Sequence, residues 1–490
     1  VKVNMCLSGL MVSRTKIILY HHELCKKIKI YYILYFGGSM MEKLFKLKEN
    51  GTDVKTEIIA GITTFLAMAY ILAVNPSQLG TIDGASAGAI LTGTAISAAI
   101  ATLCMAFFAN YPVALASGMG LNAFFAFTVC GAMQIPYSVA LTAILVEGII
   151  FMLLSLCKFR EALINQIPEN LKFGITAGIG LFITIIAMIN AGVVVNNEAT
   201  LLGIGDFGSP QFILALAGLL IIGVLHHFKV PGDILLGIII TWVLGIIAEL
   251  CGWYQPDPAN GVYSLIPSFS SLKIEAPTFC NFDFSYIAKN LSTFLVVMFT
   301  FLYTDIFDTV GTLIGVAEKG NLLDENGELP HATGALMADA VGTCVGAALG
   351  VSTVSSYVES SAGVSAGGRT GLASVVTAIL FLISIVFAPI FLAIPSFATA
   401  PAMMFVGLLM LSSIKNVNFD SDIADTLGAF AAIVFMPLTY SIANGIMFGM
   451  LTWVILKVFT GKVKEVKPVM WVTTALFALY FVLKFLHIMG

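Results

Sequence analysis

Charged residues are scarce in this chain. Asp, Glu, Lys and Arg make up 11% of its 490 residues, whereas 58% are hydrophobic, and the mean hydropathy is +0.97. A soluble domain carries about 25% charged residues. The composition therefore excludes a string of soluble domains and indicates one large domain inside a lipid bilayer. The sequence also lacks a basic pattern typical of nucleic-acid binding, so we expect no nucleic-acid partner.

Cysteine patterns that hold metals or build disulfide frameworks are missing as well. None of the eight cysteines belongs to a CxxC pair. Most of them lie in apolar runs, as Cys104, Cys130, Cys157 and Cys344 do. We expect buried thiols, no metal site and no cofactor apart from a transported coupling ion.

Long apolar runs, broken by Gly, Pro and charge, fill most of the chain. Each is long enough to cross a bilayer, or to cross half of it with a partner. We predict fourteen membrane segments, at about 57–74, 86–108, 113–131, 137–156, 171–192, 210–228, 232–252, 291–317, 332–349, 351–366, 370–393, 398–414, 423–437 and 440–459. Residues 470–488 are apolar enough to span too, and we expect an added peripheral helix there.

Basic residues are absent from the short loops that this count places outside, which are 75–85, 193–209 and 438–439. Lysines cluster instead before the first segment, as at Lys43 and Lys46. Further basic residues lie in the loops that the count places inside. By the positive-inside rule the N-terminus is expected to be cytoplasmic, in a multi-pass plasma (inner) membrane protein.

The first 40 residues form a separate case. Residues 1–39 are a basic and aromatic mixture without amphipathic period, and a normal-looking start, MEKLFKLKENG, begins at Met41. No small-residue cleavage site follows an apolar core, which argues against a signal peptide. We expect residues 1–40 to be a non-native or disordered extension. A genuine basic amphipathic extension is the alternative.

A weak internal repeat runs through the chain. TTFLAMAY from Thr63 matches STFLVVMF from Ser292, and GIIITWVLG from Gly237 matches GMLTWVILK from Gly449. Both matches imply a shift of a little over two hundred residues. An odd number of segments per half would invert the second half in the membrane, and transporters place their sites where such halves meet.

Two corresponding segments, the third and the tenth, are rich in Gly and Ser. Lipid cannot hydrogen-bond an open backbone, so such chain is stable at membrane depth only where protein or a cavity covers it. We expect Val113–Ser117 and Ser352–Ser356 to be extended chain that leads into half helices. Their free N–H groups would face a shared cavity.

Carboxylates lie inside several segments, where ionisable residues mark functional sites by default. Asp305 and Asp308 are three residues apart, on one side of a helix, which suits reversible protonation or cation capture. Asp339 and Glu359 follow in the next two segments. Each has an alternative interpretation. Asp305 and Asp308 could lie at a helix end in water, and Asp339 could be a boundary residue bonded to backbone. Glu359 could be neutralised by nearby hydroxyl groups. Glu147 has no polar neighbours in sequence, and we interpret it as a structural or secondary proton site.

No Lys or Arg lies mid-segment to pair with these acids. Unpaired acids in a dry cavity favour a neutral, hydrogen-bonding substrate or a bound cation over an anion. Ser352 and Thr353 offer hydroxyl groups, and Phe124 offers a stacking face, for which ordinary packing is the alternative. His226 is expected to be solvated at a cytoplasmic edge.

Five motifs occur in order between Met41 and about residue 465. They are TTFLAMAYILAVNP from Thr63, ASGMGLNAFFAF from Ala116, TDIFDTVGT from Thr304, ALMADAVGT from Ala335 and STVSSYVESSAGVSAGGRTGL from Ser352. Together they resemble nucleobase–cation symporter family 2, and within it the azaguanine-resistance-type permeases for adenine, guanine and hypoxanthine.

The resemblance implies an all-α polytopic membrane protein with fourteen segments in two inverted repeats of seven, in which segments 3 and 10 are part strand and part half helix. It implies a core domain at 41–160 and 291–393 and a gate domain at 161–255 and 394–465. An extracellular loop would occupy 256–290 and an extra helix 466–490.

The resemblance also assigns roles. Asn122, Asp305 and Glu359 match substrate-binding residues, and Asp308 and Asp339 match supporting or coupling residues. Thr309 lies in the same motif as Asp308, and we group it with them.

The implied function is a secondary active transporter, not an enzyme. It would import purine nucleobases by symport with H+, or with Na+, through an elevator movement, in a possible homodimer. A channel or anion carrier of the same architecture is one alternative, against which stands the lack of intramembrane Arg or Lys. An intramembrane aspartyl enzyme using Asp305 and Asp339 is the other, and the GxGD-like context of such enzymes is missing.

Overall fold

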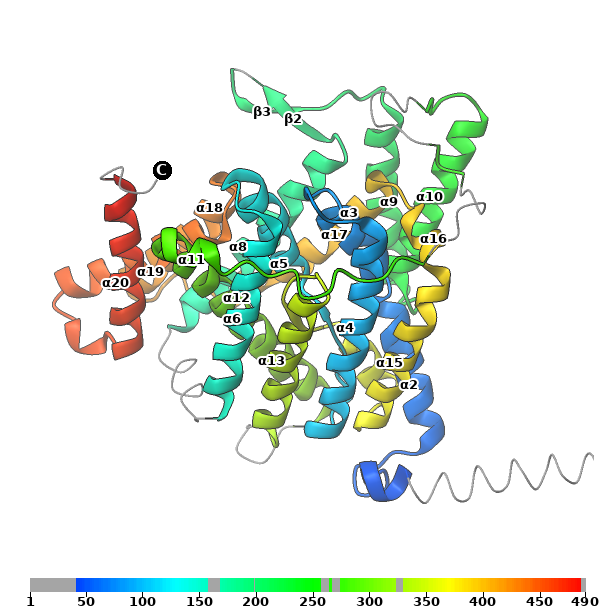
Figure 1. Cartoon of the computed structure of the whole chain (residues 1–490), viewed down its shortest axis with the longest axis horizontal. Coiled ribbons are helices and arrows are strands. Elements are labelled where there is room, and N and C mark those ends of the chain that lie inside the picture. Colours follow the sequence, from blue (N-terminus) through cyan, green and yellow to red (C-terminus); the bar gives the residue numbers. More distant parts are fainter. Residues whose placement is uncertain are drawn as a thin grey trace, which may run out of the picture.

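The computed structural model describes residues 41–156, 168–197, 199–256, 264–266, 274–322 and 329–485. The extension predicted at 1–40 lies outside these residues, as does Cys157. Helices dominate the part that is described, with two short two-stranded sheets (Figure 1).

The first half of the chain contains ten helical or strand elements up to and including the β2–β3 hairpin, and two long helices after it. They are α2 (Val54–Met68), α3 (Ile71–Leu79), α4 (Ala87–Phe108), β1 (Leu115–Ser117), α5 (Met119–Ala123), the π-helix η1 (Phe124–Ala132), α6 (Tyr137–Leu156), α8 (Glu169–Asn190), β2 (Val194–Asn197), β3 (Leu201–Ile204), α9 (Pro210–His227) and α10 (Asp233–Leu250). Side-chain capping sets one of these boundaries. Asp53 accepts the N–H groups of Lys55 and Thr56 and so starts α2.

The second half runs from a short connecting helix to the C-terminal helix. Its elements are α11 (Ser285–Lys289), α12 (Leu291–Gly320), α13 (Ala332–Ala348), β4 (Val354–Ser356), α14 (Ser360–Ser365), α15 (Gly371–Ser384), η4 (Ile385–Phe387), α16 (Ala388–Leu392), α17 (Ser396–Leu411), η5 (Ser412–Asn416), α18 (Ile423–Leu438), α19 (Ile442–Phe459), η6 (Val463–Glu465) and α20 (Pro468–Phe485). Helix α20 covers the last apolar stretch and packs on α19 and α12 at the edge of the molecule (Figure 1).

The number of apolar helices matches the predicted segments. Within the described ranges, nine helices are long and apolar enough to cross a membrane, and four more are apolar but shorter. With the broken crossing β4–α14 these correspond one to one to the predicted segments. Segment 3 is the short helix Met119–Ala132 preceded by β1.

The helices pack in two groups. The first bundle consists of α2, α4, α6, α12, α13, α14 and α15, and the second of α8, α9, α10, α17, α18 and α19. Small residues let backbones approach closely in both. A Cβ added at Gly371 of α15 would lie 2.4 Å from the Ala106 carbonyl oxygen, and one at Gly180 of α8 would lie 2.5 Å from that of Gly407.

The two broken segments meet in the first bundle. Strands β1 and β4 pair antiparallel, with Ala116 opposite Ser355. The expected extended stretches at Val113–Ser117 and Ser352–Ser356 are therefore confirmed over their last three residues. The pairing satisfies backbone groups that lipid could not satisfy.

Matching threonines fix the two strands. The Thr102 hydroxyl of α4 bonds both the N–H and the carbonyl of Leu115, at 2.9 and 3.1 Å. The Thr343 hydroxyl of α13 does the same for Val354, at 3.3 and 3.0 Å. One of these contacts comes from the first half of the chain and the other from the second.

The expectation of buried thiols is wrong for the described cysteines, of which Cys251 and Cys280 are exposed. Cys104, Cys130 and Cys344 are free but half-buried. Lipid tails are as apolar as a protein interior, so a thiol on a membrane helix need not be enclosed by protein.

Candidate functional site

Asn122 and Ser352 join the two broken segments. The buried Asn122 amide oxygen accepts hydrogen bonds from the hydroxyls of Ser117, at 2.8 Å, and Ser352. The Ser117 and Ser352 hydroxyls lie 3.0 Å apart. These predicted substrate residues thus hold each other across β1 and β4, and their contact with substrate stays a prediction.

Glu359 lies just before α14 and is half-buried. Its carboxylate accepts a hydrogen bond of 2.5 Å from the hydroxyl of Tyr70, at the junction of α2 and α3. Tyr357, two residues earlier, donates its hydroxyl to the Ser117 carbonyl at 2.6 Å. One carboxylate and two tyrosines thus gather beside the crossing of the strands.

Asp308 of α12 belongs to the same group. It is half-buried, and its carboxylate accepts a hydrogen bond of 3.0 Å from the hydroxyl of Ser355 on β4. It is also close enough to Glu359 for their charges to repel. The structure therefore brings Asp308 and Glu359 to one place.

Asp305 of α12 does not belong to the group formed by Asp308 and Glu359. It is fully buried, and its carboxyl group meets that of Glu147 on α6. Three residues of α-helix leave about 60° between two side chains, which is enough to separate Asp305 from Asp308. Glu147 lacks polar neighbours in sequence, but in the fold its neighbours Asp305 and Asp339 come from α12 and α13.

Asp339 of α13 is also fully buried. It accepts hydrogen bonds from the hydroxyls of Thr309, at 2.8 Å, and Ser356, at 3.4 Å. Asp339 and Thr309 thus lie behind β4 and touch it through Ser356. This geometry suits a supporting role, which stays a prediction.

Phe124 and Thr353 are enclosed by protein. The Phe124 ring has no exposed surface and packs edge-on against Phe301, with ring centroids 5.0 Å apart. The Thr353 carbonyl accepts the N–H of Gly118 at 3.0 Å. Its hydroxyl is buried and has no hydrogen-bond partner within the described ranges, and its contact with substrate stays a prediction.

The comparisons with known proteins decide the identity. The family model Xan_ur_permease, described as the Permease family, matches residues 55–448. The chain is 40% identical over 444 residues to the adenine permease AdeP of Escherichia coli (strain K12), covering 90% of this chain and 96% of that one. The chain belongs to this permease family.

Two further comparisons, one by sequence and one by structure, support the family membership and the fold. The chain is 41% identical over 457 residues to the guanine/hypoxanthine permease PbuG of Bacillus subtilis (strain 168), covering 90% of this chain and 99% of the other. The transmembrane domain of the cyanobacterial bicarbonate transporter BicA superposes with a TM-score of 0.59 at 17% identity, covering 79% of this chain and 96% of BicA's. The resemblance and the all-α fold of seven plus seven segments are confirmed, and the permease is a multi-pass membrane protein rather than an enzyme.

Sequence reasoning missed two buried polar residues of the permease. One is Tyr70, whose motif gives no sign of its partner. The other is Glu57 of α2, whose carboxylate accepts the N–H groups of Arg369, at 2.7 Å, and of Thr370 and Ala373. Glu57 caps the start of α15, since carboxylates stabilise helix N-termini.

His226 also has a partner that the sequence did not suggest. Its ring nitrogen lies 2.6 Å from the Asp233 carboxylate, and its side chain is 53% exposed. Asp233 in turn acts electrostatically on Tyr70 and Glu359. The start of α10, which carries Asp233, thus lies on the side of the second bundle that faces the carboxylate site of the first.

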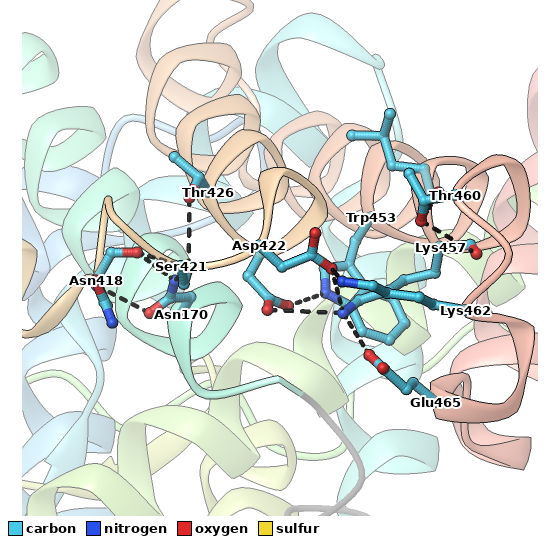
Figure 2. A network of polar contacts seen from close by, with 12 residues as sticks. Asn170, Asn418, Ser421, Asp422, Thr426, Trp453, Lys457, Thr460, Lys462 and Glu465 are labelled. Carbon is cyan, nitrogen blue, oxygen red and sulfur yellow. Dashed lines mark hydrogen bonds and ion pairs between the residues drawn. The ribbon is translucent and has the colours of Figure 1, made fainter.

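The permease also has an ion-pair network at the end of its second bundle (Figure 2). The Lys457 ammonium, on a side chain 4% exposed, binds Asp422 at 2.7 Å and Glu465 at 2.6 Å. Its hydrogen bond holds the pKa of Asp422, which lies outside the membrane segments, below its usual range. The network ties the ends of α18 and α19 to η6 and lies apart from the carboxylate site.

Proposed function

We propose that this permease imports purine nucleobases, that is adenine, guanine or hypoxanthine, by symport with a cation, and that the cation is H+. Support comes from relatives named for adenine and for guanine and hypoxanthine, at 40% and 41% identity over most of the chain. The plasma membrane, with the N-terminus in the cytoplasm, is the expected location.

The observation that carries the proposal is the pairing of Glu359 with Tyr70 beside Asp308, at the crossing of two half-unwound segments. In the part of the chain that the structure describes, the ion pairs of Lys, Arg and His involve neither carboxylate. The two groups can therefore accept hydrogen bonds from the N–H edge of a flat, uncharged base.

The proposed movement is of the elevator type, with the first bundle as core domain and the second as gate domain. Contacts between them include two sites of close approach. A Cβ at Gly120 would lie 2.8 Å from Ile179, and one at Gly232 would lie 3.1 Å from the Leu66 carbonyl oxygen. Small residues at both contacts leave no side chain interlocked between the bundles, which supports a rigid-body movement.

The test is uptake of radiolabelled hypoxanthine and adenine into cells that lack their own purine permeases. Uptake by the permease, its inhibition by a protonophore, and its loss in a Glu359→Gln variant are expected. A labelled anion would enter instead if the anion-carrier alternative holds. Purine uptake that a protonophore leaves unchanged, and that needs Na+, would refute proton coupling.

A further inference from the structure

We propose that Ser355 of β4 positions the Asp308 carboxylate in the purine site, and that Gly118 is a glycine because a side chain there would displace the Ser355 hydroxyl. Ser355 acts through Asp308, so it is a positioning residue rather than a residue that binds substrate itself. The inference rests on the proposed function, because it takes Asp308 beside Glu359 as part of the purine site.

The strand β4 lies between two carboxylates. Adjacent side chains of a strand point to opposite faces. The Ser355 hydroxyl donates to Asp308 of α12 at 3.0 Å, whereas the Ser356 hydroxyl donates to Asp339 of α13 at 3.4 Å. Both serines are buried, and Asp308 is half-buried. Ser355 therefore supplies its hydroxyl from the face of β4 that meets the more accessible acid.

The backbone that carries Ser355 is held on two sides. Ser355 lies opposite Ala116 in the pairing of β4 with β1. The Thr343 hydroxyl bonds both the N–H and the carbonyl of the preceding residue, Val354, at 3.3 and 3.0 Å. On a fixed backbone, a serine hydroxyl has three staggered positions about χ1. The position that reaches Asp308 fixes that carboxylate, because a hydrogen bond to a charged acceptor is short and strong.

Gly118 approaches the Ser355 hydroxyl from the other broken segment. Its N–H donates to the Thr353 carbonyl at 3.0 Å, which places it beside β4. A Cβ added at Gly118 would lie 2.8 Å from the Ser355 hydroxyl oxygen, 3.4 Å from a Leu121 methyl carbon and 3.8 Å from the Ser355 Cβ. The first separation is a clash and the other two are ordinary contacts, so the hydroxyl is the atom that a side chain at this position would displace.

Backbone conformation does not explain this glycine. Gly118 has a φ of −70° and a ψ of 123°, which any residue can adopt. The close approach to Ser355 is therefore what requires a residue without Cβ. In a Gly118→Ala variant the Ser355 hydroxyl would turn to another staggered position, or β1 and β4 would move apart. Either change removes the bond to Asp308.

The test is hypoxanthine uptake by the full-length permease in proteoliposomes, with KM and Vmax measured for Ser355→Ala and Gly118→Ala. Rates are divided by the monodisperse share of protein on size exclusion. We expect both variants to raise KM about tenfold or more, as the loss of a hydrogen bond to a charged group does, with Vmax nearly unchanged. A merely structural role would lower the monodisperse share and leave KM unchanged.

The double variant, Ser355→Ala with Gly118→Ala, tests the steric explanation. Without the Ser355 hydroxyl, the added methyl group meets the Leu121 methyl carbon at 3.4 Å and the Cβ of residue 355 at 3.8 Å. Its KM should therefore equal that of Ser355→Ala alone, rather than the product of the two separate effects. It should also fold at least as well as Gly118→Ala, so the comparison holds even where that single variant folds poorly.

Two matched controls make the same substitutions elsewhere in the first bundle. Ser384→Ala removes a buried hydroxyl that donates to the Phe381 carbonyl within α15. Gly315→Ala, on the helix that carries Asp308, places a Cβ with nothing within 4 Å. Both controls should keep the KM of the unaltered permease.

The outcomes separate the inference from the proposed function. If the unaltered permease takes up no purine, the proposed function fails and the inference fails with it. If it takes up purine but Ser355→Ala keeps its KM, the inference alone is wrong. If the effects of Ser355→Ala and Gly118→Ala multiply in the double variant, Gly118 does not act through the Ser355 hydroxyl, and the steric explanation is refuted.

Discussion

The hydroxyl of Tyr70 donates a hydrogen bond of 2.5 Å to the carboxylate of Glu359, a residue 289 positions later in the chain. Tyr70 lies between α2 and α3, and Glu359 lies between β4 and α14. The bond therefore joins an interruption in the first half to the break in the second. It orients the carboxylate that we assign to the purine.

Removing this hydroxyl should weaken purine binding. A hydrogen bond to a charged group is worth about 1.5–3 kcal/mol, so Tyr70→Phe should raise the KM for hypoxanthine by about 10- to 100-fold. Initial uptake rates against hypoxanthine concentration measure this. Tyr111→Phe is the control, because its hydroxyl bonds the Pro330 carbonyl instead. Equal KM values for both variants would contradict the role given to Tyr70.

The threonine that fixes β1 should matter for stability. Thr102→Ala leaves the buried N–H and carbonyl of Leu115 without their side-chain partner, at a cost of about 1–3 kcal/mol. Thr92→Ala, on the same helix, only removes a bond to the Gly88 carbonyl one turn away. Melting temperatures in detergent should fall for Thr102→Ala and stay nearly unchanged for Thr92→Ala. The reverse order would be inconsistent with the anchoring of β1.

Close backbone contact within the second bundle gives a further prediction. Gly180→Ala places a Cβ 2.5 Å from the Gly407 carbonyl oxygen, and such overpacking costs about 1–3 kcal/mol. Gly223→Ala on α9 meets nothing within 4 Å and should be neutral or slightly stabilising. Thermal unfolding of the two variants distinguishes these cases. A destabilised Gly223→Ala would show that general helix effects, not contact, dominate.

The Lys457 network should make stability fall in acid. The pKa of Asp422 is lowered in the folded state by its bond to Lys457, so this contribution is present above the unfolded value and is lost as the pH falls through the lowered one. Melting temperatures measured from about pH 5 downward should decline less steeply in Lys457→Met, which is also less stable at neutral pH because it leaves acids unpaired.

The control for this pH series is Lys46→Met. Its partner Glu49 is 69% exposed, and exposed ion pairs contribute little. Its melting curve should follow that of the unaltered permease at every pH. A Lys457→Met variant with the same acid dependence as the unaltered permease would rule out the network as the cause.

Much of the fold could be predicted from the sequence because lipid imposes strict rules. Apolar length sets the membrane segments, and Gly- and Ser-rich chain at membrane depth predicts the extended stretches at 113–117 and 352–356. Neither inference requires knowledge of tertiary contacts, since each follows from backbone groups that must be satisfied locally or by a covering partner.

The partners of the carboxylates could not be predicted in this way. Spacing placed Asp305 and Asp308 on one side of a helix, but about 60° of rotation decides whether a side chain meets Glu147 or Ser355. Glu147 looked isolated because its neighbours lie on other helices. Tyr70 and Glu57 gave no local signal, because their roles depend on chain that returns hundreds of residues later.

The pairing of β1 with β4 has a consequence for the two halves of the permease. Each half supplies one strand, so a chain cut after residue 256 would leave each fragment with one unpaired strand at membrane depth. Lipid offers that strand no substitute for its lost neighbour. The fragments should therefore be stable only when they are synthesised together, because neither half can fold in the membrane without the strand of the other.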